Sequence, residues 1–212
     1  PWHLLWLSVI FAICVRYVWI YKKGDERKKR RMDGLTACSL VVWIVVRAIY
    51  IAVIHEAFLY ELPFHLCSMA GILCAVHCLP GTVLALLFPN WNFYPVIHFI
   101  TLEGFLFHMG IVLYVAGKLA SHEIRPDFAK LWQVVLFLTA VVIPIYWFDK
   151  RYDVNYMFVN WPSAGSPLVW LADRMGNPGY LIGYAALVFL CMLLMDVGYL
   201  MVAGRRKQKL FF

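Results

Sequence analysis

The sequence predicts an all-α protein: a polytopic membrane helix bundle with seven transmembrane helices, six of which are clear as separate apolar blocks. Of its 212 residues, 63% are hydrophobic and only 15% are charged, whereas soluble domains carry roughly a quarter charged residues. The apolar residues come in blocks of about twenty, the length that a helix needs to cross a bilayer's hydrocarbon core. We expect one transmembrane domain over residues 1–212.

The six apolar blocks are separated by charged residues, Pro or Gly, as membrane helices are. They cover residues 2–21, 35–59, a stretch that starts at Leu62, then 95–116, 131–148 and 180–202.

Basic residues give the predicted orientation. Residues 22–34, which contain "KKGDERKKRR", form a predicted cytoplasmic loop, because Lys and Arg concentrate on that side of a membrane. The basic segments "KLASHEIRPDFAK" and "GRRKQK" share that side only if the chain crosses twice between Leu62 and Pro95. This gives seven helices, an outside N-terminus and a cytoplasmic C-terminus, and we expect a multi-pass protein of the cell membrane.

The stretch from Leu62 to Pro95 is short for two crossings, which need about forty residues at 1.5 Å each. Either "PGTVLALLFPNW" is a short or broken helix, or residues near Cys78–Pro80 are missing from the chain, which we prefer. Residues 149–179 form the longest non-spanning stretch, rich in aromatic side chains. We expect an extracytoplasmic loop that folds onto the membrane face or back into the bundle, a type that is usually functional.

Ionisable residues inside apolar blocks are expensive and are functional candidates by default. Arg47 and Glu103 fall near the middle of their helices, and an interhelical ion pair that fixes the bundle is one interpretation. Thr101 and His108 are seven residues apart and share a helix face. With Gly104, we interpret this face as one wall of a polar cavity.

The third helix carries a cysteine stripe whose first member, Cys67, lies in the first helical turn. A helix N-terminus favours a thiolate, and its free N–H groups could hold an oxyanion. A zinc site from Cys67, Cys74, Cys78 and His77 is disfavoured, because four ligands on one helix cannot surround a metal tetrahedrally. We expect no metal and no other cofactor.

Four motifs, "LPFHLCS", "FLFHMG", "NYMFVNWPSAGSPL" and "GNPGYL", resemble the YwaF-like family of bacterial integral membrane proteins. That family is similar to a eukaryotic transmembrane protein that transfers acyl groups to ether phospholipids, and more distantly to membrane hydrolases of the androgen-induced type. The resemblance implies a catalytic Cys at Cys67 and a catalytic His at His108, within a compact bundle of six or seven helices.

The predicted function is therefore a membrane-embedded lipid acyltransferase or lipid-ester hydrolase, with Cys67 as nucleophile and His108 as proton acceptor. His98 is the rival base, because it lies at the expected depth of Cys67, while His108 lies about 20 Å below Pro95. Six further residues are predicted to contact the substrate: His65, Ser68, Thr101, Glu103, Asn155 and Tyr156.

A transporter, lipid scramblase or binding subunit with a polar intramembrane cavity is the alternative function. The expected partners are membrane lipids, with anionic lipid at the cytoplasmic basic segments. Nucleic acid is not expected, because the net charge of +7 is concentrated in membrane-flanking segments. The sequence leaves the oligomeric state open.

Overall fold

The computed structural model describes residues 2–54, 79–89, 91, 94–126, 128 and 131–208, with side chains described as far as residue 202. These ranges contain seven α-helices, one 3-10 turn and no strand, which confirms the predicted helical fold. In chain order the elements are α1 (Trp2–Lys23), α2 (Glu26–Ile54), α4 (Leu79–Leu87), α5 (Phe99–Ala120), α6 (Leu131–Tyr152), η4 (Tyr156–Phe158), α7 (Pro167–Met175) and α8 (Tyr180–Gln208).

Five of the described helices are long and apolar enough to cross a membrane: α1, α2, α5, α6 and the Tyr180–Val202 part of α8. The crossing predicted to begin at Leu62 lies outside the described residues. Within "PGTVLALLFPNW", the described residues form the nine-residue helix α4, and both alternatives for this stretch, a short helix or missing residues near Cys78–Pro80, stay predictions. The seven-helix count and the orientation stay predictions.

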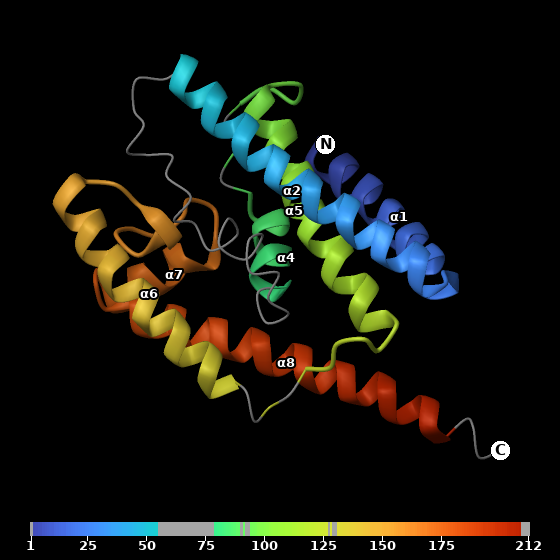
Figure 1. Cartoon of the computed structure of the whole chain (residues 1–212). Helices are drawn as coiled ribbons and strands as arrows, with labels where there is room; N and C mark the ends of the chain where they lie inside the picture. Colours follow the sequence, from blue (N-terminus) through green and yellow to red (C-terminus); the bar gives the residue numbers. More distant parts are fainter. Residues whose placement is uncertain are drawn as a thin grey trace.

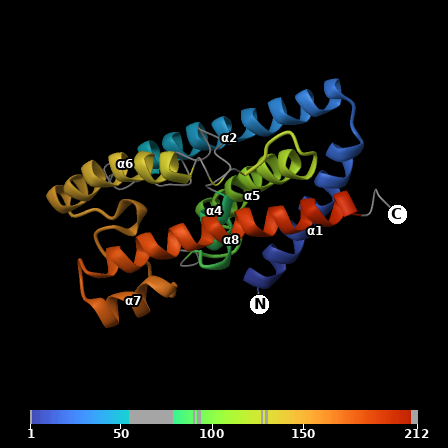
Figure 2. The ribbon, with the colours of Figure 1, turned by 90° about the horizontal axis from the view of Figure 1, so that it is seen from below.

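The helices form two groups joined by α4. Helices α1, α2 and α5 run side by side, and α6, α7 and α8 form the second group (Figure 1). Seen from below, α4 lies between α5 and α8 (Figure 2) and contacts both of them.

Helix α5 is the centre of the first group. It is 61% buried over its spanning window, whereas α1, α2, α6 and α8 are each 11% buried. Three glycines allow large side chains close to its backbone: a Cβ on Gly104, Gly110 or Gly117 would lie within 2.8 to 3.1 Å of Trp91, Leu40 or Tyr17 respectively. Small residues permit such close packing between membrane helices.

Two core clusters surround α5. One joins Ile10 of α1, Leu86 of α4 and Trp91 to Ile100 and Phe105 of α5. The other joins Leu40 of α2 to Phe107, Ile111 and Val115, which lie further along α5. Successive parts of α5 therefore pack against different neighbours, and its polar side chains lie inside the bundle.

Two predicted boundaries are wrong. The basic segment 22–34 is helical except at Gly24 and Asp25, because Lys and Arg are good helix formers and extend both apolar blocks. Helix α5 begins at Phe99 rather than at Pro95. Pro95 and the following turn precede it, and His98 caps its N-terminus.

The predicted outer loop is an ordered, folded segment after α6. Its 3-10 turn lies against α6, in a cluster of Ile145, Val154, Tyr156, Met157 and Val159. The hydroxyl of Tyr180 at the start of α8 donates to the Phe158 carbonyl at 2.7 Å. The segment is thus anchored to the helices on both sides of it.

Candidate functional site

Three buried polar residues of the first group project from α5. Thr101, Glu103 and His108 are only 3%, 3% and 7% exposed. They are buried because α1, α2 and α4 all pack on this helix. Such side chains within an apolar helix need partners or a function.

Glu103 forms an ion pair with Arg47 of α2, which agrees with one of the two interpretations of these residues. The Glu103 side chain is 5% exposed and that of Arg47 is 31% exposed. Burying an ion pair costs desolvation energy, whereas removing one partner leaves an uncompensated charge. The pair therefore fixes the position of α2 on α5 more than it adds net stability.

His108 is held in one orientation by its own helix. Its Nδ1 lies 2.6 Å from the Gly104 carbonyl oxygen. A carbonyl oxygen only accepts hydrogen bonds, so Nδ1 carries the proton and Nε2 is the basic nitrogen. Nε2 makes no hydrogen bond with any residue that the structure describes. The arrangement suits a group that accepts a proton at Nε2.

Trp91, which sequence analysis did not select, covers this part of α5. Its ring stacks on the His108 ring with centroids 4.7 Å apart, and it lies where a Gly104 Cβ would be. An indole ring therefore packs on the face of Gly104 and His108, and the polar cavity that we predicted beside this face stays a prediction. No spacing rule links Trp91 to His108, because the turn between α4 and α5 sets their contact.

Two buried polar atoms on these elements lack partners. The Thr101 hydroxyl and the Trp91 indole N–H make no hydrogen bond with the residues that the structure describes. Leaving such a group unpaired costs about 1 to 3 kcal/mol. Both groups remain available to a bound molecule.

His98, the predicted rival base, has a different environment. Its side chain accepts a hydrogen bond from the Ile100 N–H at 3.3 Å, and its ring stacks on Tyr94 with centroids 4.4 Å apart. It precedes His108 by ten residues, which is about 15 Å along α5. Because α5 starts at Phe99, His108 lies only about 14 Å from the helix start, shallower than the sequence indicated.

The structure places Asn155 and Tyr156 in the second group of helices, with α6. The side-chain oxygen Oδ1 of Asn155 accepts hydrogen bonds from the backbone N–H groups of Asn160 and Trp161, each at 3.1 Å. Its side-chain Nδ2 donates to the backbone carbonyl of Trp161 at 2.9 Å. Tyr156 is 1% exposed and contacts Phe148. Asn155 thus holds the fold of its own segment, and its predicted substrate contact stays a prediction.

His65, Cys67 and Ser68 lie outside the described residues, so their predicted roles stay predictions. In the part of the chain that the structure describes, no three His, Cys, Asp or Glu side chains are grouped to hold a metal ion. A cavity of about 240 Å³ lies between α6, α8 and the segment after α6. Its lining is apolar apart from Thr139 and Tyr184, so it offers few polar groups for chemistry.

Comparison with known proteins corrects the resemblance drawn from the motifs. The TMEM164 family model matches residues 1–196, and this match replaces the YwaF-like bacterial family that four short motifs suggested. No curated protein and no solved structure matches the chain. The family match and the five apolar helices make this a transmembrane protein. Because the match covers nearly the whole chain, the protein belongs to the TMEM164 family.

Proposed function

We propose that this protein is a membrane-embedded lipid acyltransferase or lipid-ester hydrolase in which His108 is the general base. One observation supports the proposal most directly: a buried imidazole in a spanning helix has its Nδ1 proton held by the Gly104 carbonyl. Its Nε2 is then available to accept a proton, in surroundings from which water is largely excluded.

In the proposed reaction, the Cys67 thiol gives its proton to Nε2 of His108 while the sulfur attacks a lipid ester carbonyl carbon. The ester C–O bond then breaks, and the imidazolium returns the proton to the leaving alcohol. An acceptor alcohol or water attacks the resulting thioester. Its proton passes through His108 to the departing Cys67 sulfur, which restores the enzyme.

The other predicted residues have supporting roles in this proposal. The Glu103–Arg47 pair positions α2 beside the helix that carries His108, and the unpaired Thr101 hydroxyl is available to a substrate oxygen. His65, Ser68, Asn155 and Tyr156 are proposed to contact the substrate. We propose the cell membrane as the location, which fluorescence microscopy of the tagged full chain tests.

An activated-ester lipid probe tests the chemistry on purified protein in detergent. We expect covalent labelling of wild type and its loss in Cys67→Ala. His108→Asn is the sharper variant, because the Asn amide can still donate to the Gly104 carbonyl but nothing replaces Nε2. We expect labelling to fall at least about a hundredfold, within the range of general base catalysis.

Cys38→Ala is the matched control, because Cys38 is a free, exposed thiol on α2, and it should label like wild type. The variant His98→Asn tests which of the two histidines is the base. Labelling that is unchanged in this variant supports His108 as the base. Labelling that survives both Cys67→Ala and His108→Asn would contradict the proposal.

A lipid or small-molecule transporter is the second candidate, favoured by the intramembrane pair of Arg47 and Glu103. Such charges commonly mark substrate or ion pathways. Proteoliposomes with fluorescent lipids test it. Lipid transfer between leaflets that Glu103→Gln abolishes and Cys67→Ala leaves intact would favour transport.

A further inference from the structure

The end of the molecule where α1 and α2 meet is strongly basic. Residues 22–33, with the neighbouring residues 118–125 at the end of α5, carry nine Lys/Arg and four Asp/Glu. The two segments are joined by direct ion pairs. This end therefore has an excess of five positive charges, before any tail residues are considered.

Two of the four acidic residues here, Asp33 and Glu123, belong to an internal network. Lys118 reaches Asp33 at 2.8 Å and Glu123 at 3.2 Å, and Lys29 reaches Glu123 at 3.2 Å. The Tyr21 hydroxyl lies 3.0 to 3.1 Å from carboxylate oxygens of Asp33 and Glu123. The network ties α1, α2 and the end of α5 together.

Burial disfavours ionised Glu123, but hydrogen bonds from Tyr21, Lys29 and Lys118 outweigh this and lower the pKa of Glu123 to about 2. Glu123 thus stays charged at neutral pH and keeps neutralising the two network lysines. It leaves the remaining basic side chains of this end unneutralised.

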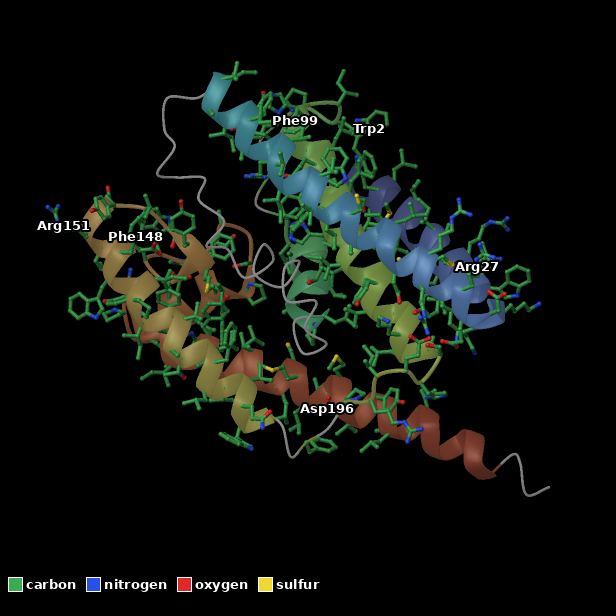
Figure 3. All side chains as sticks on the ribbon, in the orientation of Figure 1. Trp2, Arg27, Phe99, Phe148, Arg151 and Asp196 are labelled. Atoms are coloured by element: carbon green, nitrogen blue, oxygen red, sulfur yellow. The ribbon has the colours of Figure 1, made fainter. Side chains whose placement is uncertain are left out.

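Six basic side chains beside the turn at Gly24 form what we call the basic surface. They are exposed and make no ion pair with the residues that the structure describes: Lys22, Lys23, Arg27, Lys28, Arg30 and Arg31. Figure 3 shows Arg27 at this end, on the opposite side of the molecule from Arg151. The internal network therefore uses Lys29 and Lys118, and six of the seven remaining basic residues form the basic surface.

The basic surface adjoins the lipid-facing sides of two spanning helices. Trp19, 54% exposed, lies one turn before Lys23, whose ammonium sits 4.1 Å from the Trp19 ring centroid. Trp next to Lys at the end of an apolar helix is the usual composition at headgroup level. A ligand here would meet cations beside hydrocarbon, which matches an anionic phospholipid.

We propose that the basic surface binds the headgroups of anionic phospholipids, with a preference for those that carry several phosphates. Six outward cations within ten residues match a multivalent anion better than a single charge. The ion pairs of Lys29 and Lys118 hold the adjoining ends of α1 and α2 against the end of α5, which keeps these cations at one end of the molecule. This is a property of the surface and does not depend on the proposed catalytic reaction.

Binding is tested with the full chain in neutral detergent micelles. Three fluorescent compounds are titrated separately: phosphatidylinositol bisphosphate, phosphatidylcholine and a soluble inositol trisphosphate. We expect saturable binding of the first lipid, none of the second, and binding of the soluble headgroup at least about tenfold weaker, because it lacks the apolar contact. Equal binding of soluble headgroup and lipid would overturn the assignment to a lipid.

The triple variant Arg27→Gln/Arg30→Gln/Arg31→Gln should weaken lipid binding about a hundredfold, as the loss of three near-surface charges predicts. Its matched control, Lys150→Gln/Arg151→Gln/Arg174→Gln, removes the same charge from exposed side chains of α6 and α7 and should change binding less than about twofold. Equal losses in both variants would overturn the proposal.

A salt titration of wild type keeps the test independent of how the variants fold. Raising salt from about 0.1 M to about 0.5 M should weaken binding at least about tenfold, because it screens exposed charges. Binding that does not respond to salt would contradict an electrostatic headgroup site.

Discussion

The two groups of helices differ in how far along the chain their main polar contacts reach. In the α5 group an ion pair joins two helices: Glu103 pairs with Arg47, which is 56 residues away, although His108 bonds within its own helix. After α6 the contacts are local: Asn155 bonds to backbone five and six residues on, and Asn160 bonds to the Val154 carbonyl. The first pattern joins helices into a bundle, and the second folds one segment on itself. A substitution in α5 should therefore destabilise the whole bundle. A substitution in the segment after α6 should destabilise only that segment.

The largest expected effect is at Glu103. Glu103→Ala removes the carboxylate that neutralises Arg47 and should lower the free energy of unfolding by about 3 kcal/mol. Denaturant titration in detergent measures it. Glu103→Leu with Arg47→Met should recover part of the loss, since apolar replacements remove both desolvation costs. A loss below about 1 kcal/mol would mean that the pair does not hold α2 on α5.

Gly104 tests the close packing of the same helix. Gly104→Ala would place a Cβ 2.8 Å from the Trp91 ring and should cost about 2 kcal/mol through overpacking. Gly198→Ala on α8 is the matched control, since a Cβ there has nothing within 4 Å, and it should be neutral or slightly stabilising. Similar changes in the free energy of unfolding for both variants would show that the Trp91 ring moves aside without destabilising the protein.

Asn155 tests the local pattern. Asn155→Ala removes three hydrogen bonds to the backbone and should cost about 1 to 2 kcal/mol. We expect the loss to be confined to the segment between α6 and α7. Hydrogen exchange should rise over residues 153–166 and stay unchanged in α5. Faster exchange in α5 as well would show that the two groups unfold as one unit.

The smallest effect concerns the acid end of the pH range. The pKa of Glu123 is lowered from 4.5 to about 2 by its hydrogen-bond donors. Its contribution to stability is thus complete above pH 4.5 and is lost as the pH falls toward 2. The effect should be small, because the side chain is 29% exposed. Glu123→Gln should remove this part of the acid sensitivity, which is measured as melting temperature against pH. Identical profiles for the variant and wild type would contradict a role of Glu123 in acid stability.

Composition and block length predicted the helical membrane fold, and position within the blocks indicated the Arg47–Glu103 pair as one of two interpretations. Both follow from the cost of placing polar groups in hydrocarbon, which the sequence displays directly. The central position of α5 was not predicted, although its block carries Thr101, Glu103 and His108, because polar residues within a block do not show which helices surround it. It depends on which helices pack together, and only Gly104, Gly110 and Gly117 indicate it in retrospect.

The contact of Trp91 with His108 could not be predicted, because it depends on the path of the chain between α4 and α5. The basic segment 22–34 was predicted to be a loop but is helical except at Gly24 and Asp25, and its side of the membrane stays a prediction. Charge segregation indicates a side of the membrane and carries no information on helicity. Asn155 was selected as a polar residue in an aromatic segment, and the hydrogen bonds to its own segment emerge only in three dimensions.

The hydrogen bond from His108 to the carbonyl one turn earlier has a consequence for control of this histidine. Both atoms belong to α5, so the position of the ring proton does not depend on where any other helix lies. Displacement of Trp91 would uncover the imidazole without changing which nitrogen is basic. Access to this group and its readiness to accept a proton are therefore set separately, the first by a neighbouring segment and the second by the helix itself.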